Sequence, residues 1–144
     1  MNYLFDTNII VHIIKNDPRI QQLDLRIVQD PNSLRLISIV TQAEMESLAI
    51  QFGWGNKKMQ NLKALLKQFL TVPIDSTQIV DTYADIDAFS QGRHPTKKLG
   101  ATSRNMGKND LWIAATAVVT NSILVTSDGD FDHLHNKYMT IWKI

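Results

Sequence analysis

The sequence contains no cysteine, which excludes disulfide bonds and any metal site built on thiolates. It has no apolar run near the roughly 20 residues that a membrane-spanning helix needs. Its first residues lack the basic region and the small-residue cleavage site of a secretory signal. We therefore expect a protein of the reducing cytoplasm that does not use a membrane.

The chain also carries little excess charge. Its 15 basic and 14 acidic side chains give a formal net charge of +1, so the overall charge neither requires nor excludes a nucleic-acid partner. Charged residues make up 20% and hydrophobic residues 44% of the 144 positions, which is typical of a globular chain with a proper core. No internal repeat or low-complexity segment divides the sequence, and we expect one domain over residues 1–144.

Apolar residues alternate along the chain between short continuous runs, typical of buried strands, and the spacing of amphipathic helices. Strands are expected at residues 2–6, 34–40, 70–74, 122–126 and 138–142. Helices are expected at residues 7–15, 18–28, 41–52 and 56–69, from a cap at 75–76 to about 90, at 110–119, and as a turn or short helix at 129–135. This alternation predicts a three-layer α/β/α fold with a central, mostly parallel sheet.

Several acidic residues follow a strand or begin a helix, where α/β sheets carry their functional groups. They are Asp6, Glu44, Asp110 and Asp128, and the nearby Asp130 and Asp132 leave open which acid of TSDGDFD matters. Carboxylates crowded together repel one another and bind a proton or a cation. Hard oxygen ligands select Mg²⁺ or Mn²⁺, and Mg²⁺ sites typically accept substrate phosphate oxygens as well. If the acids converge, they suit phosphodiester hydrolysis.

Each acid also has a structural interpretation, which local rules alone favour. The alternative for Asp6 is a helix cap. For Glu44, in the first turn of its helix, it is a T-x-x-E capping box with Thr41. For Asp110, with Asn109 as cap, it is a favourable interaction with the helix dipole, and for Asp128-Gly129 it is a turn.

Four segments together resemble one family. They are LFDTNIIV near the start, SIVTQAEMESL at 38–48, MGKNDLWIAATAVV at 106–119 and ILVTSDGDFDHL at 123–134. In this order and spacing they resemble the PIN-domain ribonucleases, and more narrowly the VapC toxins of VapBC toxin–antitoxin systems. The resemblance implies a PIN-like fold with catalytic, metal-binding carboxylates at Asp6, Glu44, Asp110 and Asp128, and with Asp130 as a further metal ligand. Glu46 is the alternative to Glu44, although its spacing from the strand is less suitable. Polar family positions that orient the acids or water correspond to Thr7, Asn8, Asn109 and Thr126.

The same resemblance implies a function. Such proteins are Mg²⁺- or Mn²⁺-dependent endoribonucleases that cut structured RNA, often tRNA or rRNA, and leave 5′-phosphate and 3′-hydroxyl ends. They usually form homodimers and are silenced by a small VapB-like antitoxin. Residues 91–108 form a long polar loop, and the stretch from Ala88 to Asn109 carries five basic residues and no acid. An RNA-binding role and a solvated loop are both open for Arg93, Lys97, Lys98, Arg104 and Lys108.

Other enzyme classes fit less well. A haloacid-dehalogenase-type phosphatase needs a second acid at the position of Asn8, and a receiver domain needs a lysine after the late strand, which ends in Thr126-Ser127-Asp128. No serine–histidine arrangement suggests covalent catalysis, and His133 and His135 are interpreted as a surface pair. The remaining alternatives are a PIN-like module that binds RNA or protein without cutting, and a nuclease directed at DNA or at a particular structure.

Overall fold

The computed structural model describes residues 1–144, with the side chain of Val28 left aside. Within this part of the chain five strands form one sheet in the order β3-β2-β1-β4-β5, and every neighbouring pair is parallel. The strands are β1 (Asn2–Phe5), β2 (Leu34–Ser38), β3 (Leu70–Val72), β4 (Ser122–Thr126) and β5 (Ile141–Lys143). The first strand is therefore central, and the chain winds outward from it in both directions.

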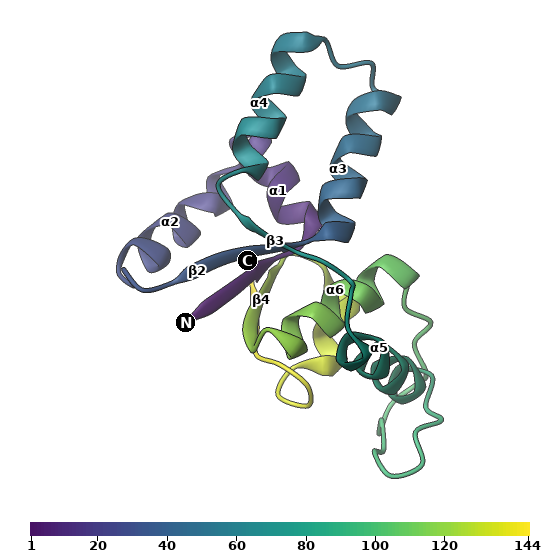
Figure 1. The fold of residues 1–144 in the computed structure, drawn as a ribbon. Helices are drawn as coiled ribbons and strands as arrows, with labels where there is room; N and C mark the ends of the chain where they lie inside the picture. The colour runs from purple at the N-terminus through teal and green to yellow at the C-terminus, as the bar shows by residue number, and fades with distance from the viewer.

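Helices cover both faces of the sheet, which confirms the predicted three-layer α/β/α arrangement. They are α1 (Thr7–Ile14), α2 (Gln21–Val28), α3 (Ile39–Gln51), α4 (Asn56–Leu66), α5 (Thr77–Ser90) and α6 (Lys108–Val119), with short 3₁₀ turns η1 (Pro18–Ile20) and η2 (Gly129–Leu134). In Figure 1, α3 and α4 project together on one side of the sheet, and α5 and α6 lie on the other. No helix in the described residues is both long and apolar enough to span a membrane.

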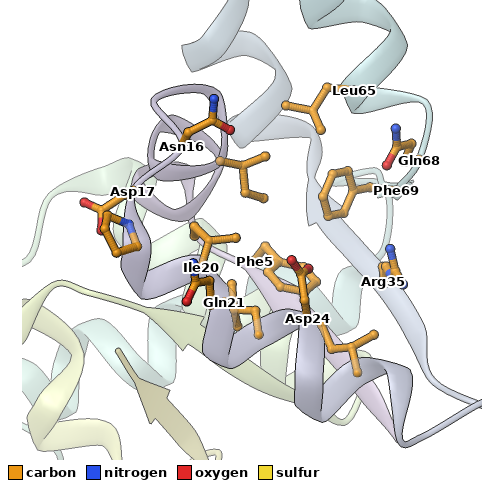
Figure 2. A pocket seen from close by; sticks show the side chains of 14 residues that line it. Phe5, Asn16, Asp17, Ile20, Gln21, Asp24, Arg35, Leu65, Gln68 and Phe69 are labelled. Atoms are coloured by element: carbon orange, nitrogen blue, oxygen red, sulfur yellow. The ribbon is translucent and has the colours of Figure 1, made fainter.

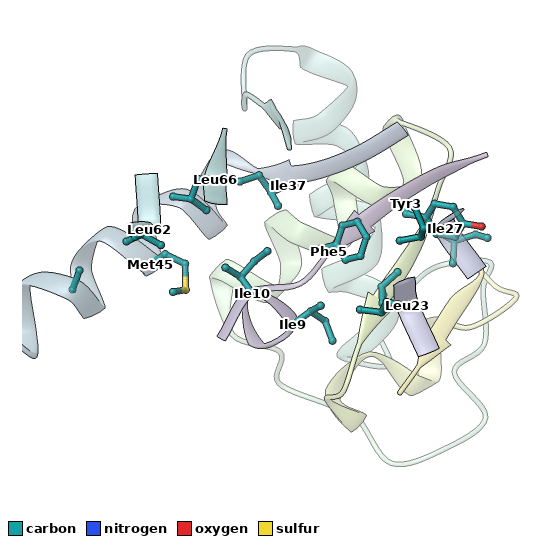
Figure 3. Packing of buried hydrophobic residues seen from close by; sticks show 13 residues of the cluster. Tyr3, Phe5, Ile9, Ile10, Leu23, Ile27, Ile37, Met45, Leu62 and Leu66 are labelled. Carbon is teal, nitrogen blue, oxygen red and sulfur yellow. The ribbon is translucent and has the colours of Figure 1, made fainter. Parts of the chain in front are cut away.

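Alternation along β1 supplies both layers of the core, because successive strand side chains point to opposite faces. Tyr3 and Phe5 face a cluster with Ile9, Leu23, and the buried side chains of α3 and α4; Figure 3 shows this packing. Leu4 faces the opposite cluster, formed mainly with α5, α6 and η2. Each fully buried side chain of this size contributes about 1.5–3 kcal/mol, so the two layers hold β1 firmly from both sides.

Strand register brings the carboxyl ends of the central strands together. Leu4 pairs with Leu36 of β2 and with Leu124 of β4, and Phe5 pairs with Val125. The amide of Asp6 continues this ladder by donating to the carbonyl of Val125 at 3.0 Å. Residues that directly follow β1, β2 and β4 consequently emerge at one edge of the sheet.

Two predicted helix starts were wrong. Strand β2 ends at Ser38, and the Ser38 hydroxyl accepts from the Val40 amide at 3.1 Å as the N-cap of α3. Thr41 is therefore a fully buried residue inside the helix, and Glu44 lies in its second turn, so the capping-box interpretation is wrong. Similarly, Gly107 is the N-cap of α6, so Asn109 is not a cap. In both cases the helix begins upstream of the polar motif.

Several other boundaries differ from the prediction. The last strand is Ile141–Lys143 and not 138–142, and Tyr138 instead donates its hydroxyl to Asp85. The expected helix at 18–28 is divided into η1 and α2, and α4 and β3 end at Leu66 and Val72, earlier than expected.

Candidate active site

Asp6 lies at the point where β1 passes into α1, and only 4% of its surface is exposed. One carboxylate oxygen accepts from the Thr7 amide at 2.7 Å as the N-cap of α1, and the other accepts from the Thr126 hydroxyl at 2.8 Å. Burial raises the pKa of Asp6 from 3.8 to about 6, and the charges of Asp128 and Glu44 add to this rise, although the two hydrogen bonds oppose it. A helix cap alone does not require burial beside other acids.

Asp110 lies in the first turn of α6 and is partly buried. Desolvation by burial and, after it, the negative charges of Asp6, Asp128, Asp130 and Glu44, in that order of effect, together raise its pKa from 3.8 to about 7. A carboxyl group with this pKa holds a proton near neutral pH unless a cation replaces it. The negative charges of acids from separate segments of the chain therefore act together on the Asp110 carboxyl group.

Asp128 and Asp130 lie at the start of η2, directly after β4. The Asp128 carboxylate caps the turn by accepting from the Asp130 amide at 2.9 Å, and the Asp128 amide donates to the Thr126 hydroxyl at 3.0 Å. Carboxylate oxygens of Asp110, Asp128 and Asp130 lie within 4.8 Å of one another. This spacing is compatible with one cation between them, and the turn interpretation of Asp128 holds at the same time.

Glu44 is linked to Asp6 through the intervening threonine. The Thr7 hydroxyl donates to Glu44 Oε1 at 2.8 Å and lies 3.0 Å from the hydroxyl of Thr41. Glu44 also lines an open groove of about 460 Å³ together with Asn109, whereas Glu46 lines a different one beside Lys63. The geometry therefore brings Glu44 toward the other acids in preference to Glu46.

Among the described residues, these carboxylates form no ion pair with a cationic side chain. The ion pairs among the described side chains join Asp17, Asp30, Asp85 and Asp132 to their basic partners, and none includes Asp6, Glu44, Asp110, Asp128 or Asp130. The donor set consists of hard carboxylate oxygens, which fits Mg²⁺ or Mn²⁺ and does not fit softer metals. A bound divalent cation would neutralise the mutual repulsion of these acids.

The basic residues predicted for RNA are dispersed around the loop that precedes α6. Lys97 donates to Asp85 at 2.9 Å and lies over the ring of Tyr138 at 4.6 Å, so its charge is already engaged. Arg104 donates to the carbonyl of Gly129 at 3.4 Å, which brings it next to Asp128 and Asp130. The others, Arg93, Lys98 and Lys108, are exposed.

Two serine–histidine contacts did not follow from the sequence. The Ser127 hydroxyl lies 3.0 Å from His12 Nε2, and the Ser90 hydroxyl lies 2.7 Å from His133 Nε2. His133 is partly buried, so interpreting it as a surface residue was wrong. Burial lowers the pKa of His133, which favours the neutral ring. No spacing rule relates residues 115 and 43 positions apart in the chain.

A separate groove of about 390 Å³ lies between α1, η1, α2 and α4 and includes none of the five acids. Figure 2 shows Ile20, Leu65 and Phe69 directed toward it, with Asp24 and Arg35 at its polar margin. An apolar floor with charged margins is suited to the apolar face of a short amphipathic segment.

Known proteins match nearly the whole chain. The family model described as PIN domain matches residues 3–137. Ribonuclease VapC1 of Haemophilus influenzae (strain R2866) is 36% identical over 129 residues, which are 88% of this chain and 86% of that protein. Ribonuclease VapC2 of Rickettsia felis is 29% identical over 143 residues, covering 99% and 98%. The solved structure of VapBC-1 from nontypeable Haemophilus influenzae has a TM-score of 0.78 at 27% identity, covering 99% of this chain and 98% of that chain.

Proposed function

The chain belongs to the PIN-domain family, and we propose that it is a metal-dependent endoribonuclease, the VapC-type toxin of a toxin–antitoxin pair. The observation that carries this proposal is the convergence of acids that follow β1 and β4 or lie on α3 and α6, where burial first and the neighbouring negative charges second raise the pKa of Asp6 to about 6 and of Asp110 to about 7. The relatives named Ribonuclease VapC1 and VapC2 support the same activity. We propose residues 1–144 as one catalytic PIN domain.

We assign the binding of Mg²⁺ or Mn²⁺ to the carboxylates at this edge of the sheet: Asp6, Glu44, Asp110, Asp128 and Asp130. When bound, the ion would activate water for attack on a phosphodiester and stabilise the charge that develops on the leaving oxygen. The catalytic acids in this proposal are the first four of these, and Asp130 acts as a ligand.

Neighbouring polar groups keep the acids in place. Thr126 holds one oxygen of Asp6, and Thr7 holds Glu44, so the two carboxylates keep fixed orientations before any ion arrives. Asn8 accepts from the Ser127 amide at 3.4 Å and supports the segment that leads to Asp128. Asn109 lines the groove beside Glu44, and we assign it a contact with water or RNA.

We propose RNA as the substrate, with tRNA or rRNA as the first candidates, and 5′-phosphate and 3′-hydroxyl ends as products. Arg104 and Lys108 are the most suitable phosphate contacts, because Arg104 lies beside Gly129 and Lys108 is two residues from Asp110. Lys97 would first have to leave Asp85, so we give it, and the more distant Arg93 and Lys98, a secondary role. Such an RNA substrate would make the cytoplasm the place of action.

The partner we propose is a small VapB-like antitoxin. The solved relative VapBC-1 bears the name of a toxin–antitoxin pair, and the groove of Figure 2 offers an apolar floor for a segment of such a partner. We also propose a homodimer. Ile50 and Phe52 near the end of α3 are 74% and 72% exposed, and exposed apolar surface of this kind is often covered by another chain. Light scattering with and without antitoxin measures both assemblies.

The deciding experiment uses protein freed of any bound partner. It is incubated with total tRNA and rRNA in Mg²⁺, in Mn²⁺ and in EDTA, next to an Asp6→Asn/Asp110→Asn double variant. An Asp81→Asn variant removes an exposed acid and serves as the matched control. Matched RNA and DNA hairpins are tested in parallel, and the product ends are mapped.

We expect discrete cuts in RNA that require metal, disappear in the double variant and persist in the control variant. Cuts that persist in the double variant would contradict the assignment of the site. Cleavage of the DNA hairpin in preference to RNA would identify a DNA-directed nuclease. No cleavage of any substrate, with no Mn²⁺ binding by calorimetry, would identify a non-catalytic RNA- or protein-binding module.

A further inference from the structure

Two successive turns of α1 hold the residue that lies between Thr126 and Asp128. Asn8 accepts from the Ser127 amide at 3.4 Å, and His12, one turn later, places Nε2 3.0 Å from the Ser127 hydroxyl. Both the backbone and the side chain of Ser127 are therefore tied to the same helix. A hydroxyl group both donates and accepts, so the contact with His12 is available to either neutral tautomer of the ring.

His12 is itself fixed from its other side. Its side chain is 17% exposed, and Nδ1 lies 3.5 Å from Asp17 Oδ2 and 3.5 Å from an Arg19 guanidinium nitrogen. Arg19 donates to both carboxylate oxygens of Asp17, at 3.1 Å and 2.8 Å, and the Asp17 amide donates to the His12 carbonyl at 3.0 Å. Hydrogen bonds from Arg19 hold the pKa of Asp17 well below its usual range, which keeps this carboxylate ionised. The imidazole thus has neighbours on both of its nitrogens.

The segment from Thr126 to Asp128 is the link between this arrangement and the acids. The Thr126 hydroxyl donates to Asp6 and accepts from the Asp128 amide, so it fixes the segment from the side of β1. His12 and Asn8 hold Ser127, which lies between Thr126 and Asp128, from the side of α1. If the contact with His12 is lost, the α1 side keeps only the longer contact of 3.4 Å between the Ser127 amide and Asn8.

We propose that His12 is a positioning residue for the metal site, which acts through Ser127 to hold the Asp128 carboxylate in place beside Asp110. This inference rests on the proposed function, because it requires that Asp128 be a ligand. Groups that orient the ligands of a metal typically change its affinity by about 10–100-fold when they are removed. His12 is one residue further from the ion, so we expect an effect of about 3–10-fold, at or below the lower end of that range.

The order Ser127, His12, Asp17 resembles the triad of a serine hydrolase, but its geometry favours positioning. The distance between His12 and Asp17 is 3.5 Å, longer than the short bond that orients a catalytic imidazole. Asp17 is also engaged by Arg19 through both oxygens. A nucleophilic Ser127 would be labelled by a fluorophosphonate probe, and such labelling would overturn the proposal.

The test measures Mn²⁺ binding by calorimetry on the purified full chain, in parallel with metal-free thermal unfolding. The variants are His12→Ala, Ser127→Ala, the double variant, and His12→Gln, whose amide reaches the position of Nε2. His135→Ala is the matched control, since the only hydrogen bond of this exposed imidazole among the described groups is with the Ile141 amide.

We expect His12→Ala and Ser127→Ala each to weaken Mn²⁺ binding by about 3–10-fold, and the double variant to be no weaker than either, since contacting residues are not additive. His12→Gln should bind within about twofold of the wild type, and His135→Ala should be unchanged. Additive losses, or a loss in His12→Ala that His12→Gln does not restore, would reduce His12 to a structural residue and overturn the proposal. Equal binding by wild type and His12→Ala would also overturn it. Absence of binding by the wild type would instead refute the proposed function.

Discussion

Replacing Asp6 by asparagine should stabilise the metal-free protein at pH 8. Asp6 is buried, and the rise of its pKa from 3.8 to about 6 corresponds to about 3 kcal/mol, at about 1.4 kcal/mol per tenfold change in acidity. Asparagine keeps the shape of the side chain and still accepts from the Thr7 amide, but the Thr126 hydroxyl loses its charged acceptor, which costs about 1 kcal/mol. The net gain should be about 2 kcal/mol, or roughly 4–8 °C in Tm.

The pH dependence identifies the cause of this gain. The native wild type holds its proton on Asp6 up to about pH 6, whereas the unfolded chain releases it near 3.8. Stability from this group is therefore fully present below pH 3.8 and is lost as the pH rises through about 6. At pH 5 the difference between Asp6→Asn and wild type should fall by about 1.4 kcal/mol, to about one third of its value at pH 8.

Urea unfolding in EDTA at pH 8 and pH 5 measures both effects, and Asp81→Asn is the control. Added Mn²⁺ should stabilise the wild type by about 2.7 kcal/mol at a hundredfold excess over its Kd, and Asp6→Asn much less. An Asp6→Asn variant less stable than wild type at pH 8, or a gain equal at both pH values, would mean that burial of charge is not the cause of the raised pKa.

Three further perturbations follow from the same structure. Thr126→Val removes the hydroxyl that donates to Asp6 and should lower stability by about 1–3 kcal/mol in urea unfolding, whereas Thr126→Ser should stay near wild type. The affinity for Mn²⁺ should fall by about 10–20-fold between pH 8 and pH 6, because Asp6 and Asp110 take up protons with pKa values of about 6 and 7, which calorimetry in two buffers measures as proton release. Leu124→Ala, in a fully buried position, should cost about 2–5 kcal/mol in urea unfolding, whereas Phe52→Ala, at 72% exposure, should change stability by less than about 0.5 kcal/mol.

The parallel sheet was predictable because its strands are continuous apolar runs, and the strand-end rule led from there to Asp6 and Asp128. The rule works because the carboxyl ends of parallel strands lie at the same edge of the sheet. The start of α3 was not predictable in the same way. Ser38 and Thr41 both suit an N-cap, and both are fully buried in the structure, so the choice between them depends on where β2 ends, which the local pattern does not determine.

Most side-chain contacts between distant segments of the chain could not be predicted from the sequence. Lys97 belongs to a basic stretch, but its partner Asp85 lies 12 residues earlier on α5, and His94 joins the same carboxylate at 3.0 Å. His12 and Ser127 are 115 residues apart. Such contacts depend on how helices are rotated against the sheet, which apolar periodicity defines too coarsely to pair individual polar groups.

The bond between Thr126 and Asp6 spans 120 residues, and this has a consequence for synthesis of the chain. Asp6 leaves the ribosome near the beginning of translation, whereas β4 and Asp128 follow only when most of the protein has been made. Long-range parallel pairing is slow to form, and domains fold as units when their last pairing elements are available. A growing or truncated chain that ends before β4 therefore lacks the proposed site, and its capacity to damage RNA would begin only once the chain is almost finished.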